Sequence, residues 1–543
     1  MKIFVLGKKC FSYFVEYIMQ FIAEIIMKIL QIAISLMIVF VLSKIFGLIT
    51  NGEMVELKSN IFLLTLCYVV YLVLGFFQFE LKQRIEKNIR VNTKKDIMFK
   101  ILQNYIEVNQ KGMNIDSSRI TEIIYTDINN ITTYVYVLSE ICMAGIMLIV
   151  IAVILFKINF KLSLILFVWC VITGFWVYLY SKKLKKINRR LRSETDRHFK
   201  LARDILNNLK YICISNSRAH FFSKYEKNIE SVKDMTAYRD KKAWILGYIS
   251  SVFDGVWIIL LLIYSISRIQ NGKLGITEVV LFLSYAKIYS NQITKILNQL
   301  AYLQQVMVSV ERVFELTDTY NIEKYANGKF PSQVSNIDIS EIYFNYKDKK
   351  IFEDFNKKIM RHGIVITGKN GRGKTTLLNL MSGFLSPDSG NIFINDIPLH
   401  DMSIDSILRA IAYAPQGDVI FDMSIRENIL SFDGADQIEE AQLWEMCREF
   451  QLLDDILGLE KKFETILSES QTLSFGQKKK ISLIRTCLRT SKIVLLDEPL
   501  EGLDKLSQEK VVKYILSLSQ QKYVIVATHR PEQFSGYDEI VSL

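Results

Sequence analysis

The chain has 543 residues, 50% of them hydrophobic, and a mean hydropathy of +0.20. This composition is too apolar for a wholly soluble enzyme and favours a membrane domain joined to a soluble domain. The formal net charge is +11. Because much of the basic excess flanks apolar segments, membrane orientation accounts for it and no nucleic-acid partner is needed.

Residues 1–20 contain Lys8 and Lys9 followed by an interrupted apolar stretch. A secretory signal peptide would end at a small-residue cleavage site, and none stands out before the long apolar segment that follows. The sequence therefore predicts a short helix lying in the membrane surface.

Six apolar stretches are long enough to cross about 30 Å of hydrocarbon at about 1.5 Å per helical residue. They lie at residues 21–47, 61–79, 135–157, 160–181, 243–267 and 276–300. We therefore expect an all-α transmembrane domain of six helices over residues 1–320, surrounded by membrane lipid.

Basic residues predict the orientation, because Lys and Arg accumulate on the cytoplasmic side. The segment 182–192 carries seven Lys or Arg residues and no acidic residue, and 82–100 is similarly basic. The links near 48–60, 158–159 and 268–275 are short and sparsely charged. The sequence thus predicts a multi-pass protein of the cell membrane with both termini in the cytoplasm.

Several ionisable residues fall inside the predicted spans, where a charge is costly and points to a cavity or a partner. Asp254 and Lys287 each lie about ten residues from a helix end, so both can sit near mid-membrane. Glu140 lies closer to an end, where its side chain can reach water. Pairing between Asp254 and Lys287 and direct contact with a transported molecule both remain open.

Residues 321–335 are predicted to be a linker, because Asn327-Gly328 and Pro331 interrupt the helical pattern. The remaining segment, 336–543, has the short apolar runs and helical stretches of an α/β domain.

The first motif of this domain is a phosphate-binding loop of pattern G-x-x-x-x-G-K-T, formed by Gly368, Lys369, Asn370, Gly371, Arg372, Gly373, Lys374 and Thr375. It follows an apolar run and precedes a helical stretch that begins at Thr376, which is the context the motif requires. Its backbone N–H groups, the helix N-terminus and Lys374 are expected to bind phosphates, and Thr375 to hold Mg²⁺. The alternative is a chance glycine-rich turn, which the later motifs argue against.

Two further motifs follow in the chain. The first is Leu473-Ser474-Phe475-Gly476-Gln477. The second is the apolar run 493–496, which ends in Asp497-Glu498 and predicts a buried parallel strand with two carboxylates at its end. Asp497 is expected to bind Mg²⁺ and Glu498 to polarise the attacking water. Alone, such a strand is more often structural than catalytic. Its position after the phosphate loop is what favours the catalytic role.

The segment 473–477 resembles the signature motif of the ABC ATPase superfamily. Tyr346, Gln416, Asp504 and His529 also stand where that family has functional residues. The chain is therefore identified as a member of the ABC transporters, of the bacterial exporter type that fuses one membrane domain to one ATPase domain.

The resemblance implies ATP and Mg²⁺ as cofactors and a role for each matching residue. Tyr346 would stack on adenine, with a core aromatic as the alternative. Gln416 would sense the γ-phosphate and reach the Mg²⁺. His529 would also sense the γ-phosphate, as a switch. A lone histidine at a strand end is more often a surface residue, but its spacing after Glu498 favours the switch role.

The resemblance also implies a dimer. Ser474, Gly476 and Gln477 of one subunit would contact the ATP held by the other. Asp504 stands in the family's aspartate loop, and the resemblance implies that it binds the nucleotide. Two positions depart from the commonest family pattern: Phe475 replaces a glycine, and Glu501-Gly502 replaces Ser-Ala.

The long connections 80–134 and 182–242 resemble the cytoplasmic extensions of ABC exporters, so export is favoured over import. Short coupling helices are expected near 114–119 and 215–222. The predicted function is ATP-driven export by alternating access in a homodimer, with a heterodimer of two half-transporters also possible. A peptide is the favoured cargo, with a lipid or hydrophobic drug as the alternative. An ATP-gated regulator or channel is the alternative from another class.

Overall fold

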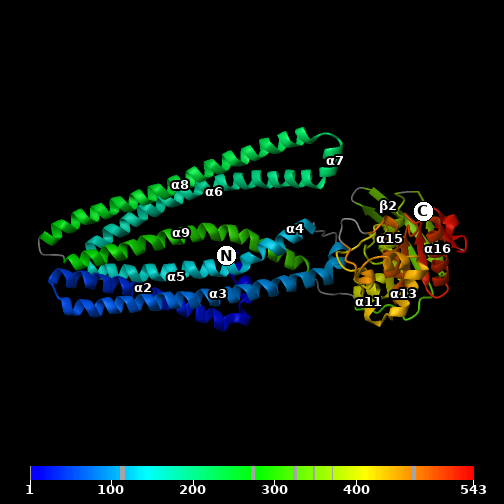
Figure 1. Cartoon of the computed structure of the whole chain (residues 1–543), viewed down its shortest axis with the longest axis horizontal. Helices are drawn as coiled ribbons and strands as arrows, with labels where there is room; N and C mark the ends of the chain where they lie inside the picture. The colour runs from blue at the N-terminus through cyan, green and yellow to red at the C-terminus, as the bar shows by residue number, and fades with distance from the viewer. Residues whose placement is uncertain are drawn as a thin grey trace. The chain divides into compact units, whose positions relative to one another are not determined.

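The computed structural model describes residues 2–110, 117–270, 275–321, 327–346, 349–369, 371–467, 473–537 and 539–543. Contacts divide the chain into two units. The first comprises Met1–Ile97 and Ser117–Leu316 and is helical, whereas the second comprises Met98–Asp116 and Thr317–Leu543 and contains two β-sheets (Figure 1). Residues 98–116, which the sequence places in the membrane domain, thus cluster with the second unit.

The helical unit is built from long helices joined by short links. Their bounds are α1 (Lys2–Ser12), η1 (Val15–Tyr17), α2 (Ile18–Asn51), α3 (Met54–Gln110), α4 (Ser117–Glu122), η2 (Ile123–Asp127), α5 (Asn129–Ile158), α6 (Phe160–Asn207), α7 (Leu209–Ile214), α8 (Arg218–Gln270) and α9 (Ile276–Thr319). The short N-terminal helix expected from the sequence is α1, and η1 separates it from α2. Figure 1 shows α6 and α8 running side by side.

The six predicted spans fall on α2, α3, α5, α6, α8 and α9. In the part of the chain that the structure describes, α2, α3, α5 and α6 are long and apolar enough to cross a membrane, and α8 has a shorter apolar run, Gly255–Gln270. Long uninterrupted helices suit hydrocarbon because they satisfy their own backbone hydrogen bonds. Membrane crossing by α8 and α9 stays a prediction.

The helix α9 is more polar than the other predicted spans, yet one of its faces is buried. Phe282 and Ala286 pack in an apolar cluster with Ile151 of α5 and Leu166 of α6. The hydroxyl of Tyr285 in α9 donates to the carbonyl oxygen of Leu36 in α2 at 3.0 Å. Its packing therefore places α9 within the helical unit.

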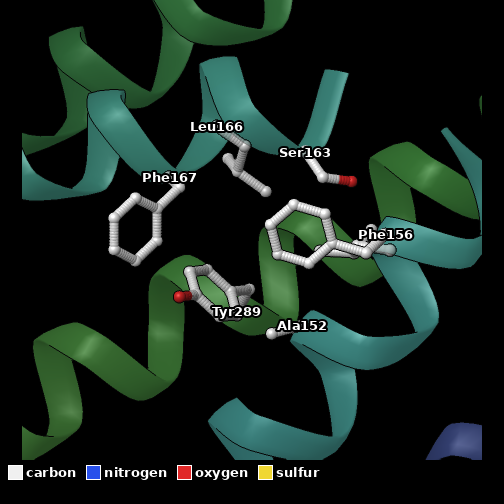
Figure 2. Close-up of a pocket in the computed structure, with 7 residues that line it drawn as sticks. Ala152, Phe156, Ser163, Leu166, Phe167 and Tyr289 are labelled. Atoms are coloured by element: carbon white, nitrogen blue, oxygen red, sulfur yellow. The ribbon is translucent and has the colours of Figure 1, made fainter. Parts of the chain in front are cut away.

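A small hollow lies between α5, α6 and α9 (Figure 2). Its lining is Ala152, Leu155, Phe156, Ser163, Leu166, Phe167 and Tyr289. The Ser163 hydroxyl donates to its own helix, at Asn159 O, over 2.8 Å. Since none of these side chains is charged, we interpret the hollow as a packing gap of the apolar cluster.

The second short helix of the connections predicted to be cytoplasmic differs from the prediction. It is α7, Leu209–Ile214, and it ends one residue before the predicted range 215–222. Asn216 has a φ of +53°, so the chain turns there, and α8 then begins at Arg218. Of the other predicted coupling helix, 114–119, residues 114–116 lie outside the described residues, and α4 begins at Ser117.

The second unit has one antiparallel and one parallel sheet. The antiparallel sheet, in the order β2-β1-β4-β5, contains β1 (Ile337–Tyr346), β2 (Lys349–Ile359), β4 (Ser389–Ile394) and β5 (Ile397–Pro398). The parallel sheet, in the order β6-β7-β8-β3-β9, contains β3 (Gly363–Thr367), β6 (Ile411–Ala414), β7 (Ile493–Asp497), β8 (Tyr523–Ala527) and β9 (Glu539–Ser542). The helices of this unit are α10 (Lys374–Met381), α11 (Ile404–Ala410), α12 (Ile425–Ile429), α13 (Glu440–Glu449), α14 (Leu453–Leu457), α15 (Phe475–Leu488) and α16 (Lys505–Leu518).

The parallel sheet determines where the functional loops meet. Every residue of β7 and β8 is buried, as expected for parallel strands covered on both faces. Ala527, the last residue of β8, pairs with Asp497 of β7 on one side and with Ile366 of β3 on the other. The loops that follow these three strands therefore leave the sheet at one edge, where ligands bind in open α/β sheets.

The end of α3 contacts the loop that follows α10. The side-chain amide of Asn109 donates to the backbone carbonyl oxygen of Phe384 at 3.1 Å. The side-chain amide of Gln110 donates to the backbone carbonyl oxygen of Gly383. Nearby, Asn104 donates to the carbonyl oxygen of Tyr320 at 2.7 Å. These contacts explain why residues 98–110 cluster with the second unit although they continue a helix of the first.

Asn428 organises the segment before α12. It is fully buried, accepts from Phe421 N at 2.9 Å, and donates to the carbonyl oxygens of Phe421, Met423 and Ser424 at 2.9–3.2 Å. One side chain thus satisfies backbone groups that water cannot reach.

We expect Asn428→Ala to destabilise the second unit by about 2–3 kcal/mol, because it leaves buried donors and acceptors unpaired. The melting temperature of the purified protein should fall by about 5–10 °C. The exposed Gln437 provides the control, and Gln437→Ala should leave the melting temperature unchanged. Equal melting temperatures for the two variants would contradict the assignment.

Candidate nucleotide-binding site

The phosphate loop has a backbone that only glycine permits at key points. Gly371 and Gly373 have φ values of +81° and +100°, in the left-handed region. A Cβ on Gly373 would lie 2.7 Å from Ile351 and 2.9 Å from Phe352. The helix α10 begins directly after it, at Lys374, so its unpaired N–H groups face the loop. This geometry suits an anion.

Lys374 is 8% exposed, and its Nζ donates to Gly368 O at 2.7 Å. The same nitrogen lies 3.9 Å from Oε1 of Glu498. Thr376 follows in the first turn of α10 and is buried. Asn370, also predicted to bind the nucleotide, lies outside the described residues. The structure thus joins the loop lysine to the predicted catalytic carboxylate.

Thr375 and Asp497 form the candidate metal site. The Thr375 hydroxyl donates to Oδ2 of Asp497 at 2.6 Å, and Asp497 is 2% exposed. Burial raises the pKa of Asp497, an effect opposed by the Thr375 hydrogen bond and increased by the charge of the neighbouring Glu498. A hydroxyl and a carboxylate side by side are oxygen ligands of the kind Mg²⁺ prefers, so these residues fit the ion.

Glu498 sits in a constrained backbone immediately after β7. Its φ is +46°, which costs a non-glycine residue about 1–2 kcal/mol. Its Oε2 accepts from His529 Nδ1 at 2.9 Å and from the Thr528 hydroxyl at 3.1 Å. The strained residue is therefore fixed by the loop after β8, as expected at a functional site.

The contacts of His529 indicate its tautomer. Arg530 Nε donates to His529 Nε2 at 3.2 Å, so Nε2 is the acceptor and Nδ1 carries the proton that it donates to Glu498. In this tautomer His529 orients the Glu498 carboxylate. The predicted role of His529 as a γ-phosphate switch stays a prediction.

Gln416 lies in the loop after β6. Its side-chain Nε2 donates to Glu501 Oε2 at 3.3 Å, and its backbone carbonyl oxygen accepts from Lys479 Nζ at 3.5 Å. An amide binds a metal through its oxygen, so the contact with Glu501 is compatible with the predicted metal role.

Tyr346 ends β1 and is 45% exposed. Its ring meets that of the buried Phe344 edge to face, with centroids 5.0 Å apart. An exposed ring supported from one side suits a stacking platform better than the alternative of a core aromatic.

Ser474 and Gln477 of the signature motif form hydrogen bonds within the chain. Ser474 caps α15 and accepts from Gln477 N at 3.2 Å, while Gln477 Oε1 accepts from Ser474 N at 2.8 Å. Gln477 also donates to Asp455 at 2.9 Å. Among the described residues, the side-chain contacts of Ser474 and Gln477 stay within the cap and Asp455 and do not reach the phosphate loop. Their predicted contact with ATP stays a prediction.

Asp504 caps α16. It accepts from the backbone nitrogen of Ser507 at 2.9 Å and from its hydroxyl at 2.6 Å. These hydrogen bonds hold the pKa of Asp504 below its usual value, and the one from the Ser507 hydroxyl has the larger effect. The structure thus gives Asp504 a capping role, and its contact with the nucleotide stays a prediction.

The structure describes the surroundings of Glu140, one of the three residues predicted to contact the cargo, more fully than those of the other two. Glu140 of α5 accepts from Gln299 of α9 at 2.7 Å and lies 3.5 Å from Lys295 Nζ. This pairing gives Glu140 a structural role between two helices. Lys287 lies on α9 and Asp254 on α8, but the Asp254 side chain lies outside the described structure. Their pairing stays a hypothesis.

The sequence did not reveal a buried ion pair behind Gln416. Lys479 of α15 is 2% exposed, and its Nζ lies 3.3 Å from Oδ1 of Asp418, whose side chain is 3% exposed. Burial raises the pKa of Asp418, and Lys479 opposes that effect. Helical spacing could have predicted that Lys479 is buried, because it lies on the same face of α15 as the buried Leu483 and Thr486.

The family model described as the ABC transporter transmembrane region matches residues 21–293, and the model described as ABC transporter matches residues 358–501. The chain belongs to the ABC transporter family. The second unit, apart from residues 98–116, is therefore the ATPase domain, and the first unit belongs to the transmembrane domain of a multi-pass membrane protein.

Similar curated proteins differ in what their names say they transport. A probable ABC transporter ATP-binding/permease protein of Haemophilus influenzae is 29% identical over 59% of this chain and 57% of its own length. An ATP-dependent lipid A-core flippase of Desulfotalea psychrophila is 24% identical over 72% of this chain and 68% of its own. A lactococcin-G-processing and transport ATP-binding protein of Lactococcus lactis is 26% identical over 54% and 42%, respectively. The chain thus spans less than two thirds of the first and third of these relatives.

The structure of a bacterial Atm1-family ABC exporter with ATP bound has the same fold. It superposes with a TM-score of 0.79 and 18% identity, covering 96% of this chain and 93% of that protein. At this identity the likeness concerns the fold alone.

We expect Lys479→Met to destabilise the ATPase domain by about 3–5 kcal/mol, because it leaves the Asp418 carboxylate buried without a cation. The loss should be smaller at acidic pH, where the buried carboxyl can take up a proton and become neutral. Thermal melting at two pH values would measure both effects.

The double variant Lys479→Met with Asp418→Leu should recover most of the lost melting temperature, because an apolar pair can replace a buried ion pair. Lys461→Met, at an exposed position, controls for the loss of a charge. A double variant less stable than Lys479→Met would contradict the pairing.

Proposed function

We propose that the chain is an ATP-driven exporter of the cell membrane that works as a dimer, with both termini in the cytoplasm. The observation that carries this proposal is the joined group of Lys374, Thr375, Asp497, Glu498 and His529 in a chain that also has an ABC transmembrane domain.

In this proposal each side chain has a defined task in ATP hydrolysis. The phosphate loop and Lys374 bind the β- and γ-phosphates, and Tyr346 stacks on adenine. Mg²⁺, bound at Thr375 and Asp497, would supply positive charge to the phosphate oxygens. Glu498, held by His529, accepts a proton from the attacking water.

A second subunit would complete the site. In the described part of one chain, the side chains of Ser474 and Gln477 contact the cap and Asp455 rather than the phosphate loop, which is consistent with their serving a partner's nucleotide. Because each chain carries both halves of such a site, a C2 homodimer is the simplest assembly. A heterodimer is the alternative and would show as an inactive purified chain.

For the cargo we favour an amphipathic peptide. The similarity to a lactococcin transport protein supports it, whereas the similarity to a lipid A-core flippase supports a lipid as the second candidate. The intact Glu498 favours continuous turnover over an ATP-gated regulator or channel, which could operate without hydrolysis.

We expect Glu498→Gln to reduce ATP turnover by at least about a hundredfold while ATP binding persists, because the general base is lost but the phosphate loop is unchanged. The measurement is phosphate release by the purified chain in lipid nanodiscs. Wild-type protein that binds ATP without hydrolysing it would contradict the homodimeric ATPase.

Asn109 and Gln110 are placed to couple hydrolysis to transport, because they belong to the helix α3 and contact the ATPase domain. We expect Asn109→Ala with Gln110→Ala to retain ATP turnover but to lower the ATP-dependent uptake of a labelled amphipathic peptide into inverted vesicles. Gln103→Ala, exposed on the same helix, is the matched control.

A fluorescent lipid reporter in the same vesicles separates the two cargo classes. Uptake of the peptide with no lipid movement supports peptide export, and the reverse result supports a flippase. Equal uptake by the double variant and the control would exclude the coupling role of the two residues.

A further inference from the structure

Phe475 and Gly502 contact each other across two functional loops. Phe475 is the first residue of α15, and Gly502 lies two residues before Asp504. A Cβ built on Gly502 would lie 2.1 Å from Cδ1 and 2.3 Å from Cε1 of Phe475. Gly502 also has a φ of +78°. Both the aromatic ring and the backbone conformation therefore favour glycine at this position.

The first turn of α15 approaches the same loop through its backbone. A Cβ on Gly476 would lie 3.0 Å from Gly502 O. The Phe475 ring is nevertheless 55% exposed, so it does not belong to the apolar core. Burial alone gives little reason for a phenyl group at this position.

Gly502 belongs to a tight turn that directly follows the catalytic carboxylate. The backbone nitrogen of Glu501 donates to Glu498 O at 3.3 Å, and that of Leu503 donates to Leu500 O at 3.3 Å. The Glu501 side chain accepts from Gln416 Nε2 at 3.3 Å. A shift of the backbone at Gly502 would therefore move the group that holds Gln416.

We propose that Phe475 is a positioning residue of the ATPase site. Its ring holds the backbone at Gly502, which keeps Glu501 against Gln416. The two departures from the commonest family pattern are then a single feature, because the ring occupies the space that a side chain at 502 would need. This inference rests on the proposed ATP hydrolysis.

The test is a double-mutant cycle of ATP turnover. Gly502→Ala should lower kcat by about tenfold, because the new methyl group displaces either the loop or the ring and the contact is lost in both cases. Phe475→Ala should lower kcat for the same reason. KM for ATP should change little, because Tyr346 and the phosphate loop are untouched.

The decisive comparison is the double variant, Phe475→Ala with Gly502→Ala. If one contact underlies both defects, the double variant will be at least as active as Gly502→Ala alone. Independent defects would multiply, and a double variant slower than both single variants overturns the inference. A fully active Gly502→Ala also overturns it.

Gly434 offers a matched control for backbone strain. Its φ is +89°, and no atom lies within 4 Å of a Cβ built there. Gly434→Ala thus introduces the same type of strain without the aromatic contact, and its kcat should equal that of the wild type. A loss as large as that of Gly502→Ala would assign the effect to general destabilisation and overturn the inference.

Hydrogen exchange separates this inference from the proposed function, since it requires no turnover. Phe475→Ala should accelerate exchange at the amides of Glu501 and Leu503, whose hydrogen bonds maintain the turn. Unchanged exchange there overturns the positioning role. Absence of turnover in the wild type would instead count against the proposed ATPase, independently of this result.

Discussion

The arrangement of the ATPase domain depends on burying a parallel sheet on both faces. The strands β7 and β8 are wholly apolar up to their ends, so their polar residues can appear only where the strands leave the sheet. Parallel strands end at the same edge, and the pairing of Ala527 with Asp497 and Ile366 aligns three of those ends. The phosphate loop, the two carboxylates and the His529 loop are neighbours for this reason.

This edge concentrates opposing charges in a space with little water. Asp497 and Glu498 are adjacent acids, and both are buried. Burial raises the pKa of Asp497, and the charges of the buried Lys374 and Lys479 oppose part of that rise. Placing two carboxylates together is unfavourable unless cations or donors compensate for them. A nucleotide bound with Mg²⁺ would add further negative and positive charge at the same place, so ATP binding and the local electrostatics depend on each other.

The helical domain solves a related problem in a different solvent. Hydrocarbon offers no hydrogen bonds, so the backbone forms long helices, and a buried polar side chain is stabilised by a partner on a neighbouring helix. Glu24 of α2, which is fully buried, accepts from Gln78 of α3 at 2.9 Å. Glu140 pairs with two residues of α9. Such pairs connect neighbouring helices and restrict how they can slide past each other.

The sequence by itself determined the features that depend on local patterns. The strand, loop and helix around Lys374 and the apolar strand before Asp497 follow from short segments, and so do the apolar spans on α2, α3, α5 and α6. These predictions succeed because periodicity and short motifs are set by neighbours in the chain.

Only the tertiary structure decided which distant segments meet. It joined Gln477 to Asp455, paired Lys479 with Asp418, and set the Phe475 ring against Gly502. It also grouped the end of α3 with the ATPase domain. No pattern of neighbouring residues predicts these contacts, because each joins segments that are distant in the sequence and meet only when the core is packed.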